Sequence, residues 1–278
     1  MDRLDAFNAI AAQANRGELT FPANVNATLR LQQALNDPDC HSEQAAKLIQ
    51  ANPLLAARSV AIANSTAYNR TDNPITSVRA AVQRLGVRTL QSLVAALIVR
   101  QIGSEITDPG LRKKMDQLWE HTAHVAALAQ VIARRVTRVD ADTALFAGIM
   151  HEVAGFYMLS CAGEYPQVMD GEPEDWIDHG EIAIGRGVMT RLDVPEAVVA
   201  AIETMWGGLC ALPPDTLGDT LLLANELSPV PSPLYQRPNV IQQQGARTID
   251  FVLGEGSLHA IMLESAEEVR SLYAVLVA

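Results

Sequence analysis

The sequence contains few cysteines, and those present form no recognisable pair. Cys40, Cys161 and Cys210 are odd in number, far apart and never in a CxxC arrangement. This spacing argues against a disulfide framework and against a zinc site built from cysteines, and it favours a reducing compartment. Residues 1–15 do not read as a signal peptide, because they are amphipathic and carry two early acids. We therefore expect a cytoplasmic protein.

Long hydrophobic runs and surplus positive charge are also missing. The longest uninterrupted apolar run, 93–99, is far shorter than the roughly 20 residues that cross a membrane, so no membrane contact is expected. Asp and Glu number 32 against 21 Lys and Arg, which gives a formal net charge of −11. Because binding to phosphates needs a surplus of basic residues, no nucleic-acid partner is expected either. We interpret the basic group Arg134, Arg135 and Arg138 as complementing a helix C-terminus.

The hydrophobic residues that are present follow a helical period. They make up 49% of the chain, only 5% of it is aromatic, and Ala, Leu, Val and Ile predominate, which suits close-packed helices. Apolar residues recur at alternating spacings of three and four. The most regular stripe is Leu111, Met115, Leu118, Thr122, Val125, Ala129, Ile132 and Val136. The sequence predicts an all-α fold.

Breaks in this period predict how the chain is divided. Asp108-Pro109-Gly110 interrupts the helical pattern, so we place a lobe boundary near it. The prediction is a bilobed multi-helix chain with an N-terminal helical lobe at 1–106 and a second helical lobe at 107–212. Residues 213–278 are expected to form a C-terminal helical extension that packs on the second lobe. In that extension, Ser265 and Glu268 predict a capping box at the start of a helix.

The pair His151-Glu152 is the main candidate for chemistry. It lies inside the apolar segment 144–160, ALFAGIMHEVAGFYMLS, where a charged pair is costly to bury without a purpose. His121 flanks the stripe of the long helix described above, so its side chain can face inward. Histidines and carboxylates that meet in this way are the ligands of a divalent metal that activates water.

The order of these motifs resembles a known family. The segment 31–94, with its Asn64-Ser65 loop and its Leu85-Gly86 pair, resembles the signature of the HD-related output domain, HDOD. The segments 118–133, 148–159 and 180–202 resemble the HD phosphohydrolase fold. The resemblance runs from about residue 21 to residue 206. It implies a bilobed helical domain of bacterial signalling proteins that acts through protein contacts, usually without catalysis.

The resemblance also implies a metal site with altered ligands. Working HD enzymes carry one histidine, a His-Asp pair and a later aspartate, and these places fall on His121, His151-Glu152 and Asn225. Asn225 removes a negative charge, and Glu152 moves its carboxylate by about 1.5 Å, the length of a C–C bond. Ligand distances at such metals tolerate only about 0.2 Å. We therefore interpret the group as a vestigial metal site.

Places where further histidines bind a second metal in related enzymes are also changed. Glu181 falls on one of them, and Met205 and Trp206 fall where a histidine pair is common. No GYP motif is present. We expect no catalytic residue and no resident metal; a single weakly held divalent cation is the alternative.

A polar loop in the first lobe is a candidate for protein contacts. The segment 64–73, NSTAYNRTDN, is long for a helical connector, and loops held by rigid helices often carry binding. The candidate contact residues are Asn64, Ser65, Tyr68, Asn69 and Arg70. In the alternative interpretation, Asn64 and Ser65 only cap helices.

Three functions follow from these patterns. The first is a non-catalytic signal-transduction module that contacts other signalling proteins, in two-component or cyclic-dinucleotide signalling. The second is a metal-dependent phosphohydrolase or phosphodiesterase acting on a nucleotide, with an atypical His-Glu metal site. The third is a small-ligand sensor with a pocket near His151. Apolar residues such as Leu258, Ile261 and Met262 cover the core or support a homodimer.

Overall fold

The computed structural model describes residues 2–69, 73–208, 211, 213–234 and 257–277. In these ranges the regular structure is helical and contains no β-strand, so the prediction of an all-α fold is confirmed. The first helices are α1 Arg3–Asn15, α2 Ala23–Asn36, α3 Ser42–Gln50, α4 Pro53–Ala63 and α5 Val78–Ile102.

The second half of the chain is built around two adjacent helices. α6 Pro109–Ile132 runs on into the π-helical turn η1 Ala133–Thr137 and packs against α7 Ala141–Met150. The elements that follow are α8 Val153–Ser160, η2 Cys161–Gly163, η3 Pro166–Met169, α9 Pro173–Asp175, η4 Trp176–Gly180, α10 Glu181–Arg191, α11 Glu196–Gly207, α12 Leu217–Glu226, α14 Ser257–Glu264 and α15 Ala266–Val277.

Six helices, α1, α4, α5, α6, α7 and α12, begin where a polar side chain accepts from a free N–H group of the first turn. Oδ1 of Asn52 accepts from Leu54 and Leu55 at the start of α4, and Pro53 occupies the first position. Asp108 caps α6 and Asp140 caps α7 in the same way. Each of these caps is a local interaction between a side chain and the backbone two or three residues ahead.

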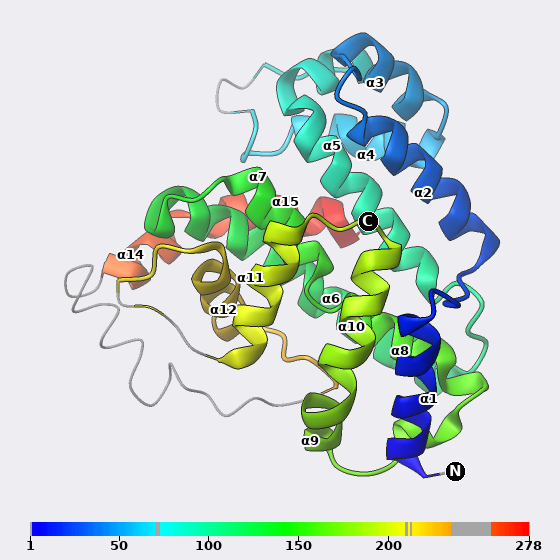
Figure 1. Ribbon diagram of the computed structural model, residues 1–278. Helices are drawn as coiled ribbons and strands as arrows, with labels where there is room; N and C mark the ends of the chain where they lie inside the picture. The colour runs from blue at the N-terminus through cyan, green and yellow to red at the C-terminus, as the bar shows by residue number, and fades with distance from the viewer. Residues whose placement is uncertain (1, 70–72, 209–210, 212, 235–256, 278) are drawn as a thin grey trace.

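Gly86 divides α5 into two helical pieces. Its φ of 75° lies in the left-handed region, which a residue without Cβ adopts at little cost. The first helical piece therefore ends at Gly86. The bend lets α5 contact α2, α3 and α4 on one side and α7 and α8 on the other. Figure 1 shows α2 to α4 grouped around one end of α5, with the later helices around the rest.

Two packing contacts cross the predicted division at residue 107. α1 belongs to 1–106 in sequence, yet it lies against α10 and η4 (Figure 1), where Phe7 and Trp176 make an edge-to-face contact at 5.7 Å. At the other end of the chain, α15 packs on α6 as expected but also on α4. The two groups of helices are therefore joined by both ends of the chain.

The predicted capping box of Ser265 and Glu268 is wrong. In a capping box, the Glu268 side chain would accept a hydrogen bond from the backbone N–H of Ser265. That N–H instead donates to the carbonyl oxygen of Ile261, as a continuation of α14. The carboxylate of Glu268 instead forms an ion pair with Arg134 of η1. Arg135 likewise pairs with Glu264, so these arginines hold the C-terminal helices in addition to facing a helix end.

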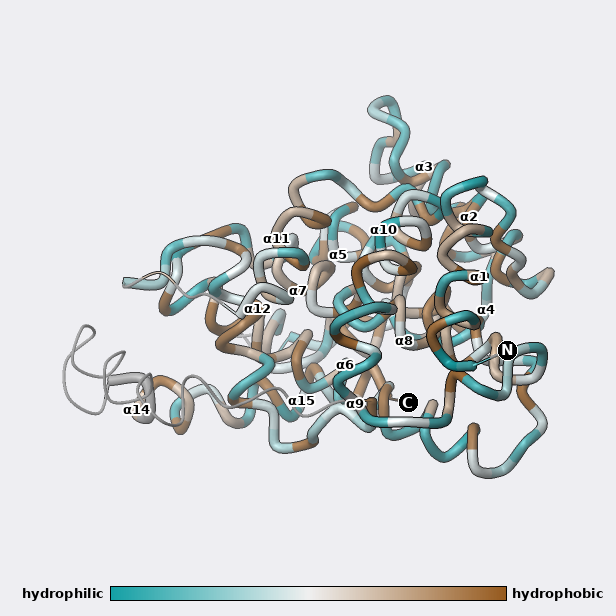
Figure 2. The backbone as a smooth tube through the Cα atoms, turned by 60° about the horizontal axis from the view of Figure 1, so that its bottom comes forward, coloured by the Kyte–Doolittle hydropathy of each residue, from teal (hydrophilic) through white to brown (hydrophobic). Residues whose placement is uncertain are grey.

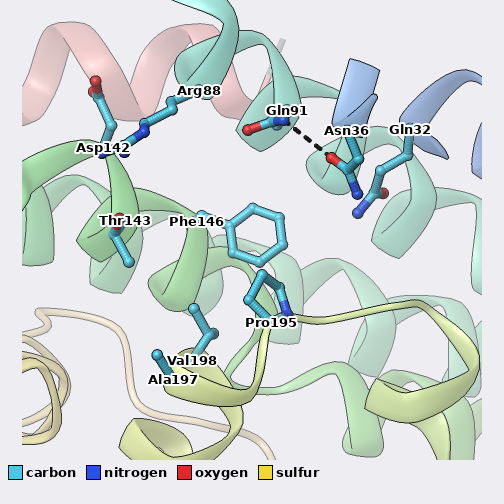
Figure 3. Close-up of a pocket in the computed structure, with 10 residues that line it drawn as sticks. All are labelled: Gln32, Asn36, Arg88, Gln91, Asp142, Thr143, Phe146, Pro195, Ala197 and Val198. Carbon is cyan, nitrogen blue, oxygen red and sulfur yellow. Dashed lines mark hydrogen bonds between the residues drawn. The ribbon is translucent and has the colours of Figure 1, made fainter. Parts of the chain in front are cut away.

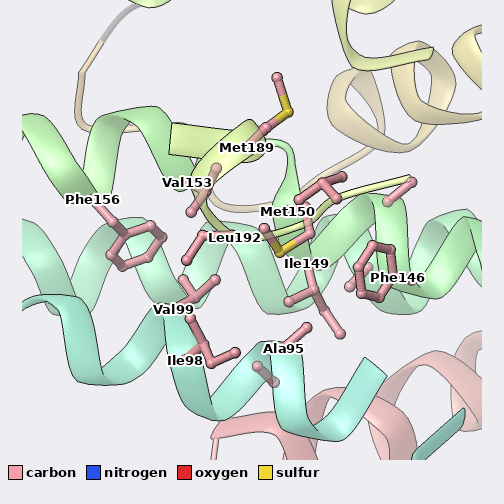
Figure 4. Packing of buried hydrophobic residues seen from close by; sticks show 14 of the residues in the cluster. Ala95, Ile98, Val99, Phe146, Ile149, Met150, Val153, Phe156, Met189 and Leu192 are labelled. Atoms are coloured by element: carbon pink, nitrogen blue, oxygen red, sulfur yellow. The ribbon is translucent and has the colours of Figure 1, made fainter. Parts of the chain in front are cut away.

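Long apolar helices form the interior. Figure 4 shows how Val99 of α5, Ile149 of α7, Val153 of α8 and Leu192 meet in one packed region, and in Figure 2 hydrophobic and hydrophilic segments alternate along most helices. All three tryptophans, Trp119, Trp176 and Trp206, are buried core residues, as expected.

Two helical stretches are long and apolar enough to cross a membrane by length and composition alone. They are Val78–Ile102 and Ala141–Gly163, and the expectation that no segment approaches a span needs this correction. Their apolar windows are 67% and 89% buried by other parts of the protein. Such burial is typical of core helices, which pass the same test of length and hydropathy.

Candidate metal centre

His121, His151 and Glu152 come together in the interior. Ligand atoms from the three side chains lie within 4.8 Å of one another, and each side chain is about 2% exposed. His121 lies in the middle of α6, and the other two form the turn between α7 and α8. A Cβ added to Gly148 would lie 2.6 Å from the Cα of Ala126, so a glycine is needed for α7 to approach α6 this closely.

The hydrogen bonds of the two rings fix which nitrogens face each other. Nδ1 of His121 lies 2.7 Å from the carbonyl oxygen of Val230, and Nδ1 of His151 lies 2.7 Å from that of Gly148. A carbonyl oxygen only accepts, so each Nδ1 carries the proton that it donates. In two neutral rings, both Nε2 atoms then present a lone pair, and these atoms lie 3.3 Å apart. A proton or a metal cation placed between them can interact with both lone pairs.

The separation of the two nitrogens fits one metal ion. Two nitrogens bound to one tetrahedral cation at about 2.0–2.1 Å lie about 3.3–3.4 Å apart, which matches the spacing in the structure. Oε1 of Glu152 lies 3.9 Å from Nε2 of His121 and supplies negative charge. Burial lowers the pKa of His121, against the opposing effects of the Val230 carbonyl and the Asn225 side chain. Burial therefore disfavours the imidazolium form of His121.

Asn225 completes the set of residues that the sequence placed here. It lies on α12, and its amide interacts with the His121 ring. The buried Oδ1 of Asn225 accepts no hydrogen bond from any residue that the structure describes. A neutral amide oxygen can ligate a cation, but it supplies no charge. The donor set is therefore two imidazoles, one carboxylate and one amide, which fits a single divalent ion.

The segment 228–234 covers this cluster. The carbonyl of Val230 holds His121, and Oγ of Ser228 donates to the same carbonyl at 2.9 Å. Leu234 is buried against Gly155, where an added Cβ would lie 2.3 Å from one of its methyl carbons. The same position is 3.1 Å from Glu152, so Leu234 fills space beside the carboxylate. In the described part of the chain, the Leu234 side chain thus lies directly beside the cluster, in the region where a small-ligand pocket was expected.

The residues at the positions expected for a second metal are buried in the core. Met205 and Trp206 are buried on α11, and the Trp206 ring lies 2.6 Å from the place of a Cβ on Gly185. Glu181 is buried at the start of α10. Among the described residues, His121, His151 and Glu152 are the only group of three neighbouring His, Cys, Asp or Glu side chains that could hold a metal ion.

Hydrogen bonds within the chain fix the conformation of the predicted contact loop. The Asn64 side chain exchanges two hydrogen bonds with the backbone of Ile75, at 2.7 and 2.8 Å, and Oδ1 of Asn69 accepts from the N–H of Asn73 at 3.1 Å. Ser65 is buried. Arg70 lies outside the described residues.

Tyr68 points inward to a buried polar network that sequence reasoning missed. Its hydroxyl donates to Oδ1 of Asp142 at 3.1 Å, and Nε2 of Gln130 donates to the Tyr68 hydroxyl. Thr89 donates to the same carboxylate oxygen at 3.3 Å. Burial raises the pKa of Tyr68 to about 12, with the Asp142 charge adding to the shift, so the hydroxyl remains a donor. No local pattern in the sequence indicates this network, because Tyr68 and Asp142 lie 74 positions apart.

Comparisons with known proteins agree with this fold. The HDOD domain family matches residues 21–203. A comparison with curated proteins gave no match. A structure from Shewanella amazonensis, named a candidate metal-dependent phosphohydrolase, is 19% identical with a TM-score of 0.70, covering 98% of each chain.

Two further solved structures resemble this fold. An HDOD domain protein of unknown function from Geobacter sulfurreducens is 20% identical, with a TM-score of 0.62, and the match covers 99% of this chain and 97% of that one. A candidate signal transduction protein from Marinobacter aquaeolei is 16% identical, with a TM-score of 0.61; the match covers 99% of this chain and 66% of that one. At these identities the likeness shows the fold, an all-α arrangement related to HD domains.

Proposed function

The chain belongs to the HDOD domain family, and from that premise we propose that it is a non-catalytic bacterial signal-transduction module that acts through protein contacts in the cytoplasm. One observation carries this proposal. The ligand cluster is about 2% exposed at each side chain and is covered by 228–234. A hydrolase needs an open metal position that its substrate can reach, and this cluster offers no such access.

The cluster then acts as a structural tie. It joins α6, the α7–α8 turn, α12 and the segment 228–234, which are far apart in sequence. A cation held there stabilises the folded arrangement without turnover. The partners proposed are other proteins of two-component or cyclic-dinucleotide signalling, and a second copy of the chain is a further candidate.

A second function is favoured by the spacing of the two imidazoles. His121, His151 and Glu152 would hold one divalent ion, and such an ion supplies an activated water for phosphoester hydrolysis. Names of similar structures, such as the candidate phosphohydrolase from Shewanella amazonensis, point the same way. For this function, the segment with Val230 and Leu234 has to leave the cluster before a phosphate can enter.

A hydrolysis panel separates the two functions. Purified full-length chain is incubated with nucleotides, cyclic dinucleotides and a chromogenic phosphodiester, with added Mn²⁺ or Fe²⁺. We expect no turnover above that of His151→Ala. Metal-dependent turnover that His151→Ala abolishes would contradict the proposal and support the phosphohydrolase. Affinity capture from the native host then identifies the protein partner.

A further inference from the structure

A cavity of about 300 Å³ lies apart from the histidine cluster, where helices from both halves of the chain meet. Its lining comes from α2, α5, α7 and the start of α11. Figure 3 shows three amide side chains, Gln32, Asn36 and Gln91, at one end, with Arg88 and Asp142 at the other. The Phe146 ring lies between these ends, above Pro195 and Val198.

Gln32 is the residue that points to a ligand. Its side chain lines the cavity although only about 3% of the residue is exposed. Oε1 of Gln32 is buried and has no hydrogen-bond partner in the described part of the chain. A buried amide oxygen without a donor costs free energy that a ligand with an N–H or O–H group would recover. Gln91 and Asn36 already share a hydrogen bond of 3.0 Å, which holds their amides beside that of Gln32.

The shape and lining favour a flat ligand with polar atoms along its edge. Amide side chains match the donor and acceptor pattern of a nucleobase edge, as Asn and Gln do with adenine. An aromatic face such as Phe146 stacks on any base. The volume lies at the lower limit for small-molecule sites, so one base with its sugar fits, and a dinucleotide does not.

The charges around the cavity disfavour a phosphate. Arg88 is the cation among the lining residues, and it lies 3.2 Å from Asp140. Asp142 adds a second carboxylate, and Glu196 occupies the first turn of α11. A phosphorylated ligand would bring its negative charge to this acidic rim.

We propose that this cavity binds a neutral nucleobase or nucleoside. Gln32 receives a hydrogen bond from the edge of the base, Asn36 and Gln91 supply the remaining polar partners, and Phe146 contacts the face. The site is separate from the metal cluster, so its ligand does not depend on a bound cation.

Calorimetric titration of the full chain with adenosine, guanosine, cytidine and uridine tests the site. We expect saturable binding of at least one nucleoside with a Kd below about 1 mM and weaker binding of its 5′-monophosphate. Gln32→Leu keeps the volume and removes the amide, so it should weaken binding by about tenfold or more. The matched control is Gln33→Leu, an exposed neighbour on α2, which should leave the affinity unchanged.

Asn36→Ala provides a second variant if Gln32→Leu fails to fold, as judged by circular dichroism. Asn36 is exposed and belongs to the same amide group. Absence of saturable binding by every nucleoside overturns the proposal. Unchanged affinity in whichever of the two amide variants fold also overturns it. A monophosphate that binds more tightly than its nucleoside does the same, because the site would then recognise the phosphate.

Discussion

Two polar clusters join α6 to α7, and they differ in how well their hydrogen-bond donors and acceptors match. In one, Oδ1 of Asp142 accepts hydrogen bonds from Tyr68, Thr89 and Gln130, so donors and acceptors match within the chain. In the other, His121 and His151 direct their Nε2 atoms at each other beside a carboxylate. The first consists of matched donors and acceptors, whereas the second presents two facing lone pairs that a proton or a cation can occupy.

This difference shows that polar side chains can be buried in a core for two different reasons. A matched network stabilises one packing arrangement with protein donors and acceptors alone. A cluster with facing lone pairs can take up a positive occupant, so its contribution depends on the solution. Removing residues from the first should therefore change stability under all conditions, and the second should respond to added metal.

The largest effect is expected for Asp142→Ala. The change leaves the donors of Tyr68, Thr89 and Gln130 without their shared acceptor, and the free energy of unfolding should fall by about 3 kcal/mol. Urea denaturation followed by circular dichroism measures it. Asp178→Ala is the control, because Asp178 is exposed, and its effect should stay within about 0.5 kcal/mol. Equal losses in both variants would show that the network contributes nothing.

Added metal should produce the next largest effect. Protein purified without added metal is expected to hold less than a stoichiometric amount, because Asn225 supplies no charge. With Zn²⁺ or Mn²⁺ at about 100 times its Kd, stability should rise by about 2.7 kcal/mol. His151→Ala should abolish this gain, measured as a shift in melting temperature. A stoichiometric metal in the untreated protein would show that the site is stronger than its ligands indicate.

Gly148→Ala should weaken the histidine cluster by a smaller amount. Its Cβ would meet the backbone of Ala126 at 2.6 Å and push α7 away from α6. We expect a loss of about 2 kcal/mol in unfolding free energy together with weaker metal binding. Gly163→Ala is the control, since a Cβ there meets nothing within 4 Å. A variant with native stability and unchanged metal affinity would contradict the close-approach argument.

The sequence predicted best what depends on neighbours along the chain. The break predicted at Asp108-Pro109-Gly110 coincides with the start of α6, because Asp108 caps that helix through a residue only three positions ahead. The approach of His121 to His151 could be expected as well, but only through the family resemblance, since the two residues lie on different helices.

Contacts between distant segments could not be predicted in this way. Tyr68 was assigned to an exposed loop because its neighbours are polar, yet its partner Asp142 is 74 positions away. Val230 was part of a proline-rich connector, and nothing in its sequence indicates that its carbonyl holds His121. Glu268 matched a local capping pattern, but Arg134 was the stronger partner. Each error arose where a long-range ion pair or hydrogen bond replaced a local one.

The smallest effect tests the matched network through pH. Tyr68→Phe removes one hydroxyl and should lower stability by about 1 kcal/mol at neutral pH. The folded protein holds the Tyr68 proton up to a pKa of about 12, against an ordinary value of 10.0. This contribution is therefore fully present below pH 10 and is lost as the pH rises toward 12. Urea denaturation of both proteins at several pH values should show the difference between them shrinking above pH 10. A constant difference would mean that the Tyr68 hydroxyl is not a buried donor.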